Sequence, residues 1–212
     1  MKRIYQRAGY YFSGLLILTL GIALTVLGGL GTSPFDALLV GLYRTFGLTI
    51  GSWEIVVGIS MIIFNAVAEK RRPEMIAIVT SLITGLGIDF WVFTLEGWVT
   101  PVAIWEESIV FFLGMVISAL GISINLQANF APIPFDRMML VIRNLTGWNV
   151  TISRAAISVV LVLLALFFNG AVGIGTLIIM ALSGAFIQYF MGWVQRFDHS
   201  IITTEKTKKT FR

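Results

Sequence analysis

The sequence predicts an all-α polytopic membrane protein with six transmembrane helices. We expect two inverted-topology three-helix repeats, each with a short re-entrant or interfacial helix. The first observation is composition: 57% of the 212 residues are hydrophobic and 12% are charged, whereas a soluble domain carries about 25% charged residues. The second is that several apolar runs are long enough to cross the roughly 30 Å hydrocarbon layer. The third is that Pro-Phe-Asp occurs at 34–36 and again at 134–136.

The first span is expected at residues 9–30, after a basic N-terminal cluster. Its small residues recur along one stripe and suit close packing against another helix. These are Gly14, Gly21, Gly28 and Gly29. The remaining spans are expected at residues 51–68, 75–95, 108–128, 152–169 and 176–194.

Two breaks, at residues 31–33 and 129–133, each lead into a short helix. The short helices are expected at residues 34–46 and 134–146, ending at Gly47 and near Gly147. Thirteen residues of helix rise only about 20 Å, which is too short to cross the membrane. They are therefore expected to be re-entrant or interfacial.

Charge predicts the orientation of the spans. If the short helices do not cross, the basic N-terminus, residues 70–72 and the basic tail fall on one side of the membrane, and the acidic loop 96–107 falls on the other. Because basic loops stay in the cytoplasm, both termini are predicted to be cytoplasmic. The chain divides into a first repeat at 1–98, a second at 99–195 and a cytoplasmic tail at 196–212.

The two halves repeat one another over most of their length. At an offset of 100, Gly14 matches Gly114 and Gly21 matches Gly121; at an offset of 99, residues 85–90 lie over 184–189. Each half has three spans, and three is odd, so the second half must enter the membrane from the opposite side. Inverted repeats of this kind are common among secondary transporters, whose sites lie near the repeat interface at broken helices.

A family resemblance follows from these motifs. It is carried by residues 31–36, by the segments at 45–51 and 146–152, and by 173–177 with Gly184 and Gln188. Over about residues 9–194 the chain resembles the YczE-type bacterial integral membrane proteins and, more distantly, their YitT- and YyaS-like relatives. The resemblance implies a multi-pass protein of the bacterial inner (cytoplasmic) membrane with a doubled architecture. It brings no established catalytic residues.

The two Pro-Phe-Asp motifs supply the first candidate site residues. Ser33, Pro34 and Asp36 have the spacing of a capping box, so the carboxylates of Asp36 and Asp136 can satisfy free N–H groups at helix starts. The alternative is that the same helix ends hold a ligand. Ile133 stands where Ser33 does and cannot cap the second helix, so the two sites need not be chemically equivalent.

Charged residues within the predicted spans supply the remaining candidate site residues. Glu54 and Arg154 occupy equivalent positions with opposite charge, and we expect them either to pair across the repeat axis or to lie at opposite interfaces. Asp89, matched by Gln188, is either a pathway residue or a headgroup contact. The candidate residues for binding substrate or ions are therefore Ser33, Asp36, Glu54, Asp89, Asp136 and Arg154.

The sequence narrows the function classes. It contains no cysteine, and its one histidine is in the tail. With no nucleophile–base pair and no metal or cofactor motif, we expect neither an enzyme nor a bound metal or cofactor. The first hypothesis is a transporter or facilitator of a small polar or charged solute, and a channel is a close variant. The alternative is a membrane-embedded accessory protein. Expected partners are lipid and an unidentified solute, without nucleic acid; homodimerisation is left open.

Overall fold

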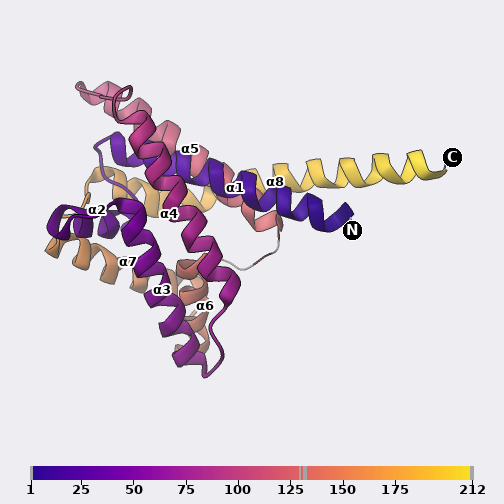
Figure 1. The fold of residues 1–212 in the computed structure, drawn as a ribbon, viewed down its shortest axis with the longest axis horizontal. Helices are drawn as coiled ribbons and strands as arrows, with labels where there is room; N and C mark the ends of the chain where they lie inside the picture. The colour runs from indigo at the N-terminus through magenta and orange to yellow at the C-terminus, as the bar shows by residue number, and fades with distance from the viewer. Residues whose placement is uncertain (1, 129, 131–132, 211–212) are drawn as a thin grey trace.

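A computed structural model describes residues 2–128, 130 and 133–210, with side chains at 5, 7–128, 130 and 133–196. Within this part the chain forms eight α-helices and no strands (Figure 1). Part of the predicted second break, residues 129, 131 and 132, lies outside the described residues. The helices are α1 (Lys2–Leu27), α2 (Pro34–Phe46), α3 (Ile50–Glu69), α4 (Met75–Leu95), α5 (Ile104–Ala128), α6 (Pro134–Thr146), α7 (Val150–Phe167) and α8 (Ile174–Thr210).

The prediction of six spans is confirmed, because six helices are long and apolar enough to cross a membrane. The predicted bounds of both short helices are also confirmed. Proline stands first in each, where its missing N–H costs nothing and its fixed φ suits a helix. Gly47 and Gly147 end them with φ angles of 77° and 74°, which favour glycine.

The order of a long helix, a short helix and two long helices occurs twice. At the centre, α1 packs along α5 more extensively than any other helix pair, while α4 lies against α1 and α8 against α5. The predicted glycine stripe makes this approach possible: a Cβ at Gly14 would lie 2.6 Å from the backbone nitrogen of Asn125, and one at Gly28 would lie 3.1 Å from that of Phe111. The stripe therefore faces α5.

Each short helix packs mainly on a span from the other half. The helix α2 lies on α7 more than on α3, and α6 lies on α3 more than on α7. The halves are thus interlocked through their short helices. The start of α1 and the end of α8 lie at the same end of the molecule (Figure 1). That the second half is inverted relative to the first stays a prediction.

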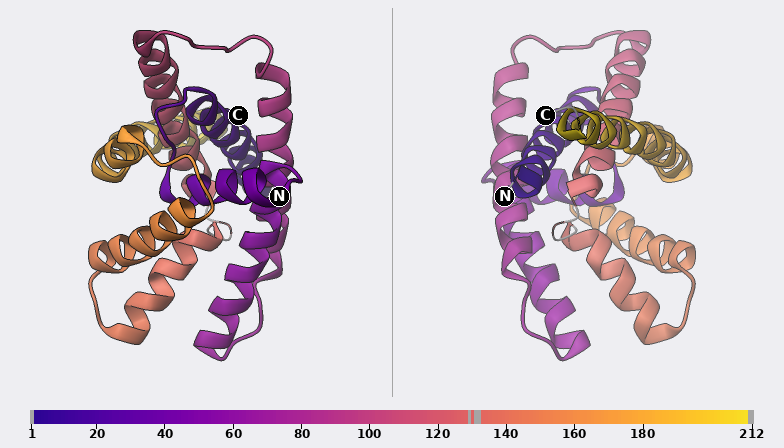
Figure 2. Two further views of the ribbon diagram at one scale, coloured as in Figure 1. Left: turned by 90° about the vertical axis from the view of Figure 1, so that its left-hand side faces the viewer. Right: turned by 90° about the vertical axis from the view of Figure 1, so that its right-hand side faces the viewer.

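The two halves differ in one contact. In the first half α3 and α4 pack closely along their length, whereas α7 and α8 have no comparable contact. Figure 2 shows α8 running apart from the α6–α7 pair in both views. The second half is therefore open at the position where the first half is closed.

Candidate functional site

The start of α2 is held by its own side chains. The backbone N–H of Asp36 donates to Ser33 Oγ at 3.3 Å, and Ser33 Oγ donates to Asp36 Oδ2 at 2.6 Å. Ser33 is therefore the N-cap that its spacing predicts. Asp36 is buried, and burial raises the pKa of its carboxyl group, while the hydrogen bond from Ser33 opposes the rise. Because α2 is not one of the six spans, Asp36 belongs to the break between two spans.

The start of α6 is held differently. Ile133 gives no side-chain cap, as its side chain predicts. Instead the carbonyl of Pro134 accepts a hydrogen bond from Asn65 Nδ2 of α3 at 3.3 Å. The Phe35 and Phe135 rings lie 6.2 Å apart between their centroids, so the two Pro-Phe-Asp motifs meet. Residues one hundred positions apart in the sequence thus form one site.

Five of the six candidate residues line a single cavity of about 280 Å³. Helices from both halves form its walls. Ser33, Asp36, Glu54, Asp136 and Arg154 lie in the lining. Sequence reasoning missed the small hydroxyl side chains that also face it, for which the signal is an isolated Ser or Thr within an apolar span. These are Thr25, Thr84, Ser118, Thr151, Ser158 and Ser183.

The charged groups in the cavity are unevenly partnered. Glu54 is only 2% exposed and makes no hydrogen bond or ion pair with another described residue. Of the two alternatives for Glu54 and Arg154, the ion pair is not formed among the described residues, although both residues line the cavity. Burial raises the pKa of the Asp136 carboxyl group, and the nearby Arg154 guanidinium opposes the rise. Of the described residues, the first half therefore contributes two carboxylates and no cation to the cavity, and the second contributes a carboxylate beside a cation.

Asp89 lies elsewhere and has a different environment. Its Oδ1 accepts from the backbone N–H of Gly51 at 2.7 Å, and its Oδ2 accepts from Thr49 Oγ1 at 2.5 Å. It is not among the residues that line the cavity. Its carboxylate satisfies a free N–H at the start of α3, where a negative charge is favoured. It connects α4 to α3.

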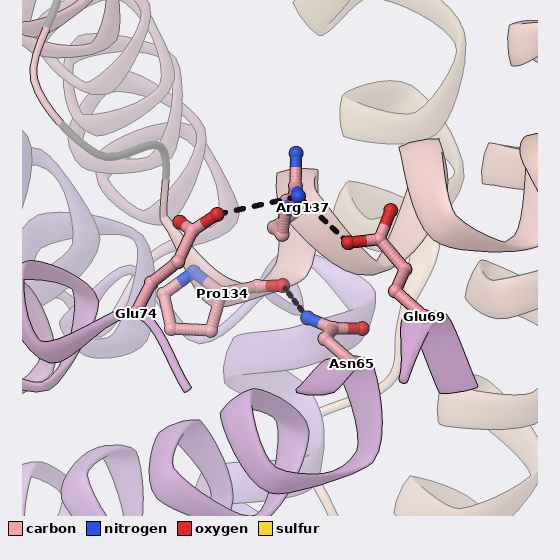
Figure 3. A network of polar contacts seen from close by, with 5 residues as sticks. All are labelled: Asn65, Glu69, Glu74, Pro134 and Arg137. Atoms are coloured by element: carbon pink, nitrogen blue, oxygen red, sulfur yellow. Dashed lines mark hydrogen bonds and ion pairs between the residues drawn. The ribbon is translucent and has the colours of Figure 1, made fainter. Parts of the chain in front are cut away.

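A second polar cluster joins α6 to the turn between α3 and α4 (Figure 3). Arg137 Nη2 lies 2.7 Å from Glu69 Oε2 and 3.3 Å from Glu74 Oε1. The side chains point toward one another beside the Asn65–Pro134 hydrogen bond. The cluster fixes the first turn of α6, and with it the second Pro-Phe-Asp motif.

Comparison with known proteins agrees with the resemblance. The family of unknown function DUF6198 matches residues 5–192. The chain belongs to this family. It is 42% identical to the uncharacterized protein YyaS of Bacillus subtilis over 88% of its length and 93% of the relative's. It is 33% identical to the uncharacterized membrane protein YczE of the same organism over 89% of its length and 86% of the relative's.

YyaS is therefore more similar than YczE, the reverse of the order expected from the motifs. An uncharacterized protein of Haemophilus influenzae is 23% identical over 92% of the chain and 88% of that relative. No solved structure matches the chain. The DUF6198 match, the membrane relative and the six apolar helices together make this a membrane protein.

Proposed function

We propose that the protein is a small transporter or facilitator that binds a positively charged solute in the cavity between its halves. The observation that carries the proposal is the convergence of Asp36, Glu54 and Asp136 on one cavity. They come from three helices and from both halves. Carboxylates within the membrane region of a protein mark ion or substrate pathways by default. Sites at the interface of repeats, beside broken helices, are typical of transporters.

The sign of the solute's charge follows from the balance of charges that line the cavity. Three carboxylates and one guanidinium line the cavity. A buried charge is costly unless an opposite charge or hydrogen bonds compensate it. Arg154 lies near Asp136, and Asp36 has one hydrogen bond from Ser33, so Asp36 and Glu54 are the carboxylates that lack a cation among the described residues. A cationic group or a proton between these two carboxylates supplies that compensation. The volume of about 280 Å³ is near the lower end of ligand pockets, so the bound part is small.

The proposal is tested with purified protein and a panel of cationic, zwitterionic and anionic solutes. A solute that binds only the folded state at one hundred times its Kd stabilises that state by about 2.7 kcal/mol. We expect cationic solutes to raise the melting temperature and to be taken up by proteoliposomes. Asp36→Asn and Glu54→Gln should abolish both effects while leaving folded protein. Glu96→Gln, in the loop after α4 and outside the cavity, is the matched control.

A channel is the second candidate, and the meeting of the two short helices favours it. Their N-termini approach one another at the Phe35–Phe135 ring contact. Current recordings and labelled-solute flux separate the two: flux through a transporter saturates and is stimulated by unlabelled solute on the opposite side, whereas a channel conducts without that stimulation. If folded protein shows neither binding, exchange nor current with any solute of the panel, transport is refuted. A role as a membrane-embedded accessory protein would then be favoured.

A further inference from the structure

The contact between α3 and α4 is made by small residues. Gly51 of α3 and Gly85 of α4 bring the two backbones together, since a Cβ on Gly85 would lie 2.5 Å from the Gly51 carbonyl oxygen. Further along, Gly58 faces the side chain of Ser81. Asp89 adds hydrogen bonds across the same helix pair. Small residues at such positions are what allow two helices to approach closely in a membrane.

The corresponding positions of the second half carry larger side chains. Under the offsets of the repeat, Thr151 replaces Gly51, Ser158 replaces Gly58 and Met180 replaces Ser81. Gly184, the equivalent of Gly85, has no atom within 4 Å of an added Cβ. The side chain of Gln188, the equivalent of Asp89, makes no hydrogen bond with a described residue. The separation of α7 from α8 is therefore encoded in the sequence.

The cavity reaches the surface at this separation. Among the described residues that line it, only Thr151, Ala155 and Met180 are exposed, and the others are buried or half-buried. The first two are on α7 and the third is on α8. Both helices are long and apolar enough to cross a membrane, and a gap between two spans opens toward the surrounding lipid. The opening thus leads sideways from the cavity.

The lining changes in character from the opening inward. On α8 it is mainly apolar, with Ile179, Met180 and Ile187 beside the single hydroxyl of Ser183, whereas Asp36 and Glu54 lie on the buried side. We propose that the α7–α8 gap is a lateral entrance through which an amphipathic cation enters from the lipid. Its charged group occupies the cavity and its apolar chain remains between α7 and α8. This inference rests on the proposed binding of a cation and adds the class of substrate and its route.

The chemistry fits this occupant better than a small polar cation. A fully water-soluble ion gains nothing from an apolar entrance and loses hydration on crossing it. An alkyl chain keeps its contact with lipid while its head group meets the carboxylates, so the chain is not moved into water on the way to the site. The cavity of about 280 Å³ holds a head group, and a long chain has to extend beyond it.

The test uses the natural absence of cysteine from the chain. In proteoliposomes, the full-length variant Met180→Cys carries one spin label at the proposed entrance. The matched control is Leu177→Cys, also exposed on α8 but outside the cavity lining. The probes are dodecyltrimethylammonium, tetramethylammonium and dodecyl sulfate, which separate the contributions of chain and charge. Accessibility is measured with oxygen, which is lipid-soluble, and with a water-soluble nickel complex.

We expect the label at position 180 to be reached by oxygen more than by nickel. Dodecyltrimethylammonium at ten times its Kd should slow maleimide labelling of Met180→Cys about tenfold, since about nine-tenths of the sites are occupied. It should leave Leu177→Cys unchanged, and dodecyl sulfate should protect neither. Glu54→Gln should remove the protection.

Three results would overturn the inference. Greater access for nickel would make the entrance aqueous. If tetramethylammonium protected Met180→Cys as strongly as the long-chain cation, the proposed cation site would stand. The proposal that the substrate is amphipathic would be refuted. A disulfide-linked dimer through Met180→Cys would show that a second copy covers the gap. If none of the three probes binds in any assay, the proposed cation site fails as well.

Discussion

The difference between the two halves predicts opposite outcomes for one substitution at two equivalent glycines. In Gly85→Ala the new Cβ would stand 2.5 Å from the Gly51 carbonyl oxygen and 2.8 Å from Ile55 Cγ1. Ordinary contact begins at 3.4 Å, so α3 and α4 must separate by about 1 Å. Overpacking of this kind costs about 1–3 kcal/mol. In Gly184→Ala no atom of another described element lies within 4 Å, so no packing cost is expected.

Both variants exchange glycine for alanine within a helix, so the gain in helix propensity is the same and cancels in the comparison. For a chain of this length about 1 kcal/mol corresponds to 2–4 °C. Gly85→Ala should therefore melt about 2–12 °C below Gly184→Ala, measured in one detergent at one scan rate. If the two melt within about 1 °C of each other, α3–α4 is no tighter than α7–α8, and the account of the open second half is refuted.

Three further outcomes are expected. Arg137→Ala should lower the free energy of unfolding by about 1–2 kcal/mol, between the values for exposed and buried ion pairs. Arg143→Ala, on the same helix α6 but outside the ion pairs with Glu69 and Glu74, should not; equal melting temperatures for the two variants would contradict this. Asp89→Ala should lower the melting temperature, because the hydrogen bonds at the start of α3 are lost, and should leave the Kd for the solute unchanged. A higher Kd would show that Asp89 contributes to the binding site. Burial raises the pKa of Asp36 above that of an ordinary Asp. As the pH is lowered, Asp36 should therefore be protonated at a higher pH than an ordinary Asp, and the loss of its negative charge should weaken cation binding. Asp36→Asn should remove that part of the pH dependence in binding titrations, with Glu54 and Asp136 contributing the remainder.

The helix pattern could be read from the sequence because its signals are local. Ser33 and Pro34 begin α2 and Gly47 ends it, all within one short stretch of chain. The spans follow from runs of apolar residues, which the thickness of the bilayer converts into helix lengths. Most of their bounds in the structure differ from expectation by a few residues, as at α7, which begins at Val150 and ends at Phe167. The exception is α8, which continues to Thr210, well beyond the predicted span at 176–194.

The roles of the candidate residues depend on contacts that are distant along the chain. The role of Asp89 follows from hydrogen bonds to Thr49 and Gly51, about forty residues earlier, and no residue near Asp89 in the sequence predicts them. The sequence signal for the open α7–α8 gap is that Met180 stands at the position equivalent to Ser81. That difference acquires meaning only when the pairing of α3 with α4 is known.

The packing of α2 on α7 has a consequence for biosynthesis. The helix α2 is synthesised roughly a hundred residues before α7, the element that it mainly contacts. At about 5–20 residues per second the ribosome needs on the order of 5–20 s to add those residues. During that interval α2 and its Pro-Phe-Asp turn have to wait in or near the insertion machinery with one face uncovered. A nascent chain stopped before Val150 is therefore the species in which a chaperone or a protease would find α2 unprotected.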